Sequence, residues 1–209
     1  MINNLDKIVP LLEFPHKDIF YFVQILQRKK DHKGVTLGGS NNNSRLIKAY
    51  FITSIDKLHK QWEEMTTLAN VFNARVSINL NPRNFQKAAF HALSKISNQM
   101  SNGDFYSVHK AYTSVCGEYH AEIDKRWLID IDTKDEILLA TVIEEVRALH
   151  EEINNQSAED RKPGYRTLAV IPSKSGYHLI THPFNLAKFS PKFPELEIHK
   201  NNPTNLFIP

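Results

Sequence analysis

Short apolar segments alternate along this chain with longer amphipathic segments, and this mixture constrains the fold more than any other feature. The short segments have the composition of strands: residues 45–53, 75–80, 126–132, 166–171 and 177–181, and two more around Asn201-Asn202-Pro203. Tight turns join several of them, and no internal repeat is present. We therefore predict an α+β fold with a largely antiparallel sheet.

The longer segments place apolar side chains at helical spacing. They are residues 16–30, 54–72, 84–98, 104–119 and 135–153. Ser54 is suited to cap the second helix, and a break at Ser101-Asn102-Gly103 separates the next two. In 16–30 the helical pattern consists of Ile19, Phe22, Val23 and Leu26.

Length and composition exclude several classes of protein. The 209 residues suit one compact unit, and the hydrophobic fraction of 41% is typical of a soluble globular domain. No apolar run is long enough to span a membrane, and the N-terminus lacks the pattern of a signal peptide. The single cysteine, Cys116, excludes an intrachain disulfide and a Cys-rich zinc site. We expect a cytoplasmic protein.

Positive charge is concentrated in the first part of the chain. Residues 1–125 carry a net charge of +5 and residues 126–209 a net charge of −2. Residues 28–60 alone hold eight Lys and Arg, an excess that either contacts phosphates or forms a solvated surface. Within this region, residues 31–44 are rich in Gly, Ser and Asn. They are predicted to form either a flexible linker or a loop over phosphates.

Two carboxylates end one of the predicted strands, as Asp130-Ile131-Asp132. Side chains two residues apart on a strand lie on the same face, so both carboxylates point one way while Ile129 and Ile131 point the other. A divalent cation relieves the repulsion between such carboxylates. The pair is therefore either a Mg²⁺ or Mn²⁺ site or a polar strand end.

A glycine turn between two later strands carries a second group of polar residues, Ser173-Lys174-Ser175-Gly176-Tyr177-His178. Hydroxyls, a lysine and an imidazole at such a turn suit the binding of a triphosphate. The alternative is an ordinary β-turn with Tyr177 and His178 packed on the sheet.

Taken together, the two motifs resemble the archaeo-eukaryotic primase superfamily of primases and primase-polymerases. Its pattern is an apolar strand ending in two acids, a later Ser-x-His motif, and a third acid on a following strand. Trp127 to Asp132 resembles the first motif, and Ser175-Gly-Tyr-His178 resembles the second with one additional residue. Glu197 is the best candidate for the third acid and Glu195 the second, while amides stand at Asn201-Asn202.

The resemblance implies an RRM-like catalytic module at residues 126–209 beside a basic N-terminal α/β lobe at residues 1–125, in one two-lobed unit. It implies metal-dependent transfer of nucleotides from NTP or dNTP onto a nucleic-acid 3′-hydroxyl in replication. Asp130 and Asp132, with Glu197, would hold Mg²⁺ or Mn²⁺, and His178 would complete the catalytic set.

The resemblance also assigns binding roles. Ser175, Lys174, His178 and Arg83 would bind the nucleotide; Arg83 follows an Asn-Pro pair, as in some primase-like chains. Arg45 and Lys48 would contact nucleic acid. The expected partners are NTP or dNTP, a single-stranded DNA template and a replicative helicase, in a phage or mobile element.

Two other functions remain open from the sequence. One is a non-catalytic nucleic-acid binding module on the same fold. The other is a metal-dependent replication-initiation nuclease, a class that often uses paired histidines. His178 and His182 are the closest pair near the motif.

Overall fold

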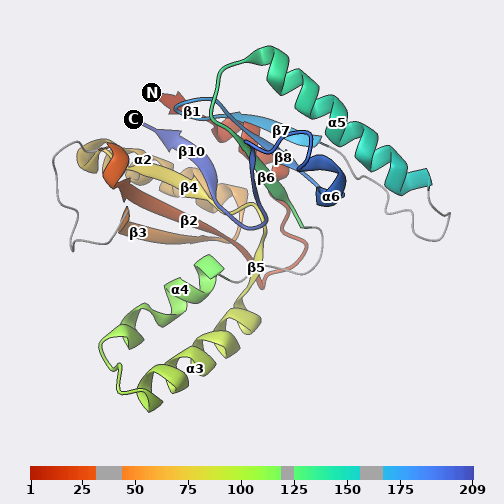
Figure 1. Ribbon diagram of the computed structural model, residues 1–209. Helices are drawn as coiled ribbons and strands as arrows, with labels where there is room; N and C mark the ends of the chain where they lie inside the picture. Colours follow the sequence, from red (N-terminus) through yellow and green to blue (C-terminus); the bar gives the residue numbers. More distant parts are fainter. Residues whose placement is uncertain (32–43, 119–124, 156–166) are drawn as a thin grey trace.

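Two antiparallel sheets, packed against each other and flanked by helices, make up the protein (Figure 1). The computed structural model describes residues 1–31, 44–118, 125–155 and 167–209. Every strand pair in these ranges is antiparallel, which confirms the predicted α+β class. Almost all of the 31–44 segment lies outside the described residues. None of the described helices combines the length and apolar character needed to cross a membrane.

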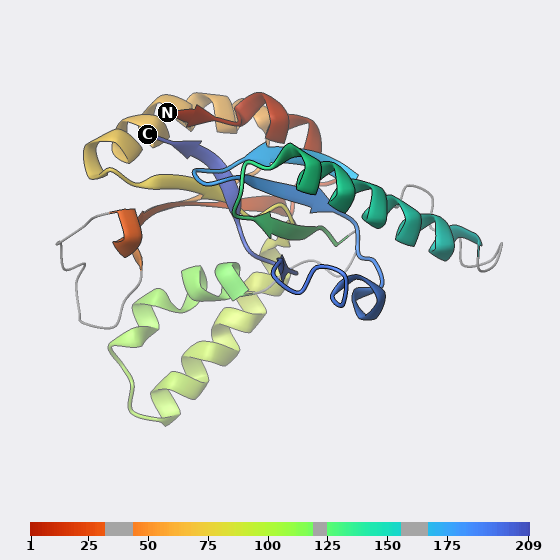
Figure 2. The ribbon, with the colours of Figure 1, turned by 45° about the horizontal axis from the view of Figure 1, so that its top comes forward.

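The first sheet has the strand order β1-β10-β4-β2-β3, and β5 pairs with β2. Its strands are β1 (Ile2–Asn3), β2 (Ile19–Arg28), β3 (Ser44–Ile52), β4 (Arg75–Ile78), β5 (Arg83–Asn84) and β10 (Thr204–Ile208). Because β10 comes from the end of the chain and pairs with β1, the two termini lie side by side (Figures 1 and 2). The C-terminal strand therefore completes a sheet that is otherwise built from the N-terminal part.

The predicted helix at 16–30 is wrong, because this segment forms strand β2. Tyr21 and Val23 point into one apolar cluster, while Phe20 and Phe22 point into another on the opposite face. A strand buried on both faces has a continuous apolar sequence, and such a run also satisfies a helical spacing. The aromatic and β-branched residues are the feature that favours a strand.

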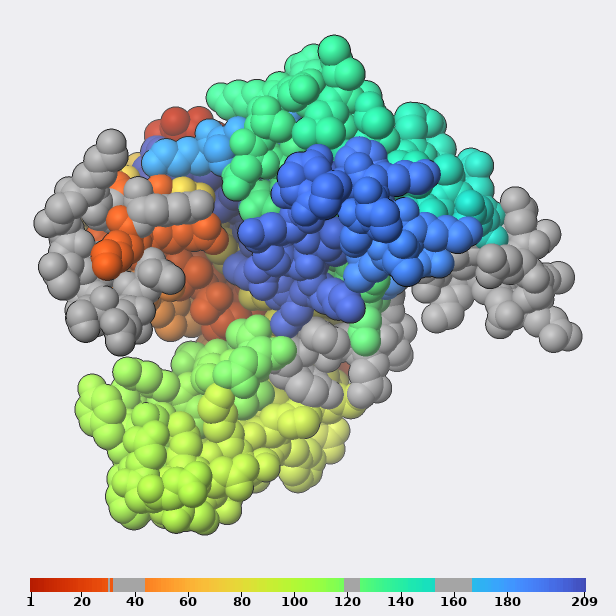
Figure 3. All heavy atoms as spheres, viewed as in Figure 1, coloured from red at the N-terminus to blue at the C-terminus, as the bar shows by residue number. Residues whose placement is uncertain are grey.

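Helices cover both faces of the first sheet. They are α1 (Leu5–Ile8), α2 (Ile55–Phe72), α3 (Phe85–Ser101) and α4 (Ala111–Glu118), with short 3-10 turns at 9–11, 29–31 and 107–110. The Ser54 side chain caps α2 by accepting a hydrogen bond from the backbone of Lys57, as predicted. Helices α3 and α4 form a hairpin that packs at its base on Phe20 and Phe22 and projects from the molecule (Figure 3).

The second sheet has the strand order β7-β8-β6-β9. Its elements are β6 (Trp127–Ile131), α5 (Glu136–Asn155), β7 (Thr167–Pro172), β8 (Tyr177–Thr181), α6 (Leu186–Phe189) and β9 (Glu197–His199). One face packs on α5 and α6 through Ile129, Ile131 and Leu179, which contact Val142 and neighbouring apolar side chains. The expected outer face of α5 includes the exposed Glu144, Glu151 and Glu152.

The other face of the second sheet packs against the first sheet. Leu128, Ile171 and Ile180 belong to the same apolar cluster as Val23 and Val76 of the first sheet. The Asn4 side chain donates hydrogen bonds to the carbonyls of Pro172 and Asn205, one on each sheet. The two lobes therefore share one core.

A polar clamp made by the segment after β4 also holds the lobes together. Asn81 donates to the carbonyls of Arg126 and Lys200 and accepts from the Arg126 backbone, and Asn79 donates to the carbonyl of Asn201. Arg83, which has no exposed surface, donates to the Cys116 carbonyl, the Asn81 carbonyl and the Asn201 side chain. Burial lowers the pKa of its guanidinium to about 10.

The expected role of Arg83 in binding a nucleotide does not agree with this position. Its guanidinium lies in the interior and is occupied by protein acceptors. The Asn-Pro-Arg sequence that suggested the role is part of the clamp, so its residues are explained by the packing of the lobes.

Replacing Arg83 by methionine should therefore destabilise the fold. The substitution removes charge-assisted hydrogen bonds to buried acceptors, and we expect the free energy of unfolding to fall by about 3 kcal/mol. Urea unfolding followed by circular dichroism measures the change. The exposed Arg147 of α5 provides the control, since Arg147→Met should change stability by less than about 1 kcal/mol. Equal effects of the two substitutions would contradict the structural role.

Candidate functional site

The polar residues of the second sheet lie on the face that points to the first sheet. Asp130 is directly opposite His178 on β8 and directly opposite Glu197 on β9. Directly opposed residues on antiparallel strands share a face, and Asp130 shares its face with Leu128, which lies in the common core. Ile129 and Ile131 point to the other face of the strand, into the core beneath α5 and α6, which confirms the prediction. The candidate site therefore lies on the same face of the second sheet as the apolar residues that pack against the first sheet.

His178 contacts Asp130 within its own sheet and Thr204 on the first sheet. Its Nε2 atom lies 3.5 Å from Oδ1 of Asp130, and its Nδ1 atom lies 2.9 Å from the Thr204 hydroxyl on β10. A neutral imidazole has one donor and one acceptor nitrogen, and the Thr204 hydroxyl can pair with Nδ1 in either state. Burial, then the positive charges of Arg28 and His199, lowers the pKa of His178 to about 4. The ring is therefore neutral at physiological pH.

The glycine turn lies against the loop that carries Asp132. The Ser175 hydroxyl donates to Oδ1 of Asp132 at 2.6 Å, and Gly176 donates its backbone N–H to the Ser173 hydroxyl. A β-carbon on Gly176 would lie 2.0 Å from the Ile131 carbonyl oxygen and 2.5 Å from that of Thr133. Glycine is therefore needed here so that the two sequence motifs can touch.

The first sheet brings an ion-pair network to the same region. Arg75 donates two hydrogen bonds to Asp31, at 2.7 Å each, and the Lys174 ammonium donates to Asp31 at 2.9 Å. Burial alone would raise the pKa of Asp31, but the hydrogen bonds from Arg75 and Lys174 outweigh it and lower the pKa to about 2. Lys174 thus pairs with Asp31 of the turn after β2 rather than with the carboxylates of its own sheet.

Arg28 ends β2, and its charge interacts with charged groups of both lobes. Burial and the nearby charge of Arg75 lower its pKa, while Asp31 and Asp130 act in the opposite direction. Its charge in turn lowers the pKa of His178. Arg28 therefore adds positive charge near the candidate site.

The structure brings together most, but not all, of the residues singled out from the sequence. Asp130, Asp132, Ser175 and His178 form one cluster, with Glu197 in register beside it. Arg45 and Lys48 lie elsewhere, exposed on the edge strand β3. Lys48 pairs with Glu64 and lies over the Tyr50 ring.

Glu197 occupies the strand position expected of a third acid, but its side chain turns outward. It is 76% exposed and pairs with His199, whose Nε2 atom lies 3.3 Å away. Among the residues that the structure describes, no group of three or more His, Cys, Asp or Glu side chains is arranged to hold a metal ion. The expected set of three carboxylates is therefore not assembled in this conformation.

Sequence reasoning assigned no site role to Arg28, Asp31, Arg75, His199 or Thr204. Arg28 and Arg75 belong to strands of the first sheet and Asp31 to the 3-10 turn after β2, and the packing of the two sheets brings them to the site. The sequence did contain one signal for these residues. An arginine ends the apolar strand β2, and another begins the apolar strand β4. A buried arginine at such a position requires an anion.

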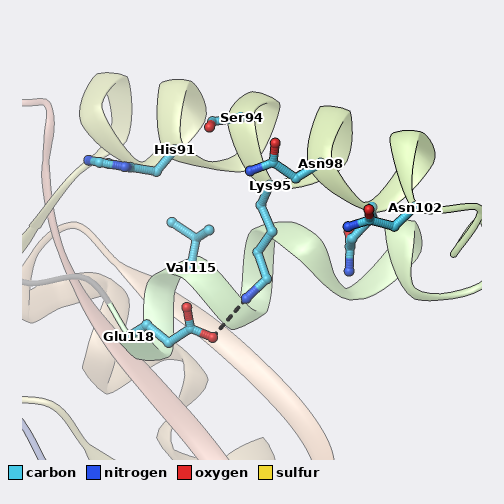
Figure 4. A pocket seen from close by; sticks show the side chains of 8 residues that line it. His91, Ser94, Lys95, Asn98, Asn102, Val115 and Glu118 are labelled. Atoms are coloured by element: carbon cyan, nitrogen blue, oxygen red, sulfur yellow. Dashed lines mark hydrogen bonds and ion pairs between the residues drawn. The ribbon is translucent and has the colours of Figure 1, made fainter.

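A groove on the helical hairpin lies apart from this cluster. Residues of α3 and α4, including His91, Lys95 and Asn98, line it, and an ion pair of 2.8 Å between Lys95 and Glu118 crosses it (Figure 4). No residue singled out from the sequence motifs is part of its lining.

Comparison of the chain with models of known protein families, with curated proteins and with solved structures finds no significant match. The arguments about function therefore rest on the sequence motifs and the geometry of the site.

The contact at Gly176 leads to a direct test of the site's architecture. Gly176→Ala forces the Asp132 loop away, and we expect a loss of about 1–3 kcal/mol in the free energy of unfolding. Gly117→Ala is the control, because nothing lies within 4 Å of its β-carbon and alanine favours the helix by about 0.5–1 kcal/mol. Urea unfolding of both variants measures the difference, and a Gly176→Ala protein as stable as the control would refute the close approach.

Proposed function

We propose that this protein is a metal-dependent nucleotidyltransferase of the primase or primase-polymerase type. The observation that carries the proposal is the opposition of Asp130 to His178 on paired strands, with Asp132 and Ser175 in contact beside them. Carboxylates, a neutral imidazole donor, a hydroxyl and several cations around one position suit a nucleoside triphosphate.

The topology of the second sheet supports an RRM-like module. Its elements follow the order β-α-β-β-α-β, and the first and third strands, β6 and β8, are adjacent in the middle of the sheet. These two central strands carry the two sequence motifs. The face opposite the helices is the one that carries the polar residues, and the N-terminal lobe lies against it.

The donor types of the site fit a hard divalent cation. Mg²⁺ usually binds one or two protein carboxylates and completes its coordination with substrate phosphates and water. Asp130 and Asp132 supply such a pair at the end of β6, and Asp132 is exposed. Mg²⁺ or Mn²⁺ held there would neutralise charge on the phosphates and favour in-line displacement at phosphorus.

In this proposal, the protein groups orient the triphosphate. His178 donates from its imidazole ring, Ser175 donates from its hydroxyl and Lys174 supplies a positive charge near the leaving group. The 3′-hydroxyl oxygen of the nucleic acid bonds to the α-phosphorus, and the bond to the pyrophosphate oxygen breaks. The hydroxyl proton leaves to water. The cytoplasmic setting, the single-stranded DNA template and a helicase partner are parts of the same proposal.

A second candidate is a non-catalytic module that binds nucleotides or nucleic acid on the same fold. The outward side chain of Glu197, paired with His199, favours it, because the third acid then contributes nothing to a metal site. This candidate predicts phosphate binding that survives loss of the carboxylates.

Substitution of the two carboxylates separates these functions. Asp130→Asn and Asp132→Asn should each abolish incorporation of dNTP or NTP on primed and unprimed DNA in Mg²⁺ or Mn²⁺, by a factor of about a thousand or more. Primer extension on denaturing gels measures incorporation. Asp18→Asn, an exposed residue outside the site, is the matched control and should retain activity.

The outcomes distinguish the candidates. A wild-type protein that binds nucleotide or DNA without a divalent ion, and does so equally well after Asp130→Asn, supports the binding module. A wild-type protein that incorporates no nucleotide under any of these conditions contradicts the catalytic proposal.

A further inference from the structure

The α3–α4 hairpin exposes a concentration of large apolar side chains. Of the nine large apolar side chains that are exposed in the described part of the chain, five lie on this hairpin or at its tip, each exposed by 49% to 77%: Phe90, Leu93, Met100, Phe105 and Tyr106. At roughly 200 Å² for each whole side chain, their exposed parts add up to about 600 Å². Exposed apolar patches of this size mark interaction surfaces.

The outer face of α3 has the spacing of a coiled-coil seam. Gln86, Phe90, Leu93, Ser97 and Met100 follow each other at alternating steps of four and three residues, the pattern that lines side chains up along one stripe of a helix. All five are exposed. None of the apolar clusters formed by the described residues includes Phe90, Leu93 or Met100. The stripe is therefore a helix face without a partner in the described part of the chain.

This stripe also carries no charge. The only Lys, Arg, Asp or Glu residues of α3 are Lys87 and Lys95. Lys95 points to the other side of the helix, where it donates to Ser114 and Glu118 of α4 (Figure 4). A single-stranded nucleic acid or a membrane surface is bound through positive charge beside the apolar contacts. An uncharged stripe instead fits another apolar helix face of similar length.

We propose that α3 packs antiparallel against α3 of a second copy of this chain, so that two hairpins form a four-helix bundle. A two-fold axis at the middle of the stripe sets Phe90 opposite Met100 of the second copy and Leu93 opposite Ser97 of the second copy, because both pairs are centred on position 95. A large side chain then meets a small one at the centre, which lets the two helices approach closely.

The ends of the stripe are complementary in the same register. The hairpin tip, with Asp104, comes to lie beside the first turn of α3 of the second copy, where Lys87 is exposed. Phe105 and Tyr106 of the tip are covered there too. Together with the polar side chains between them, the apolar groups approach the area of about 800 Å² that each partner buries in a stable interface. The hairpin extends away from both sheets, so α3 is accessible to a second copy (Figures 1 and 2).

Sedimentation velocity of the full chain, over about a hundredfold range of concentration around the micromolar level, tests this inference. The wild type should show a monomer–dimer equilibrium. Leu93→Glu should weaken the dimer about a hundredfold or more, because it places two carboxylates in an apolar seam. Ile137→Glu is the matched control, since it replaces an apolar side chain that is 80% exposed on α5, and it should dimerise like the wild type. Circular dichroism should show the same fold for both variants.

Disulfide crosslinking tests the antiparallel register. The variant that combines Phe90→Cys with Met100→Cys should form a covalent dimer under mild oxidation, because each substituted position faces the other one of the second copy. Phe90→Cys alone should give little covalent dimer, since about 15 Å along the helix axis separates its two copies. Equal yields from the two variants, or no covalent dimer from the double variant, would refute the register.

The inference goes beyond the proposed function and does not depend on it, since mass is measured without nucleotide. A wild type that stays monomeric throughout the concentration range would overturn the inference, and so would a dimer that Leu93→Glu leaves intact. A monomeric wild type whose binding of single-stranded DNA is weakened by Leu93→Glu would also overturn it and would assign the stripe to nucleic acid instead.

Discussion

Leu128, Ile171 and Ile180 of the second sheet pack into the same apolar core as Val23 and Val76 of the first. Since side chains alternate along a strand, burying Leu128 toward the first sheet also directs Asp130 there. The antiparallel register then places His178 opposite Asp130. The positions of the polar groups follow from the burial of their apolar neighbours.

The same contact between sheets has an electrostatic consequence. It brings Arg28 and Arg75 from one lobe toward Asp130 and His178 from the other. Thr204 on β10 orients the His178 ring from the first sheet, and Asp31 holds Lys174 across the junction. The site is a property of both lobes, because the second sheet alone would lose the contacts of His178 with Thr204 and of Lys174 with Asp31.

The sequence was sufficient to predict the strands of the second sheet, helix α5 and the grouping of the motifs, because each depends on local periodicity and a glycine turn, but the short helix α6 was not predicted. It was insufficient for β2, whose two buried faces hide the strand period. The sequence also suggested the wrong surroundings for Arg83. Its burial and its hydrogen bonds to Cys116 and Asn201 depend on segments that are distant in the sequence. The ion pairs of Asp31 with Arg75 and Lys174 could be recognised only once the two sheets were placed against each other.

The central claim is that a metal ion and a triphosphate bind between the two sheets beside Asp130. A crystal structure of the protein with Mn²⁺ and a dNTP, with the ion located by anomalous scattering, tests it most directly. The account predicts Mn²⁺ bound to oxygens of Asp130 and Asp132 at about 2.1 Å, with phosphates near Ser175 and Lys174. A nucleotide bound in the groove between α3 and α4, with no ion at these carboxylates, would contradict it.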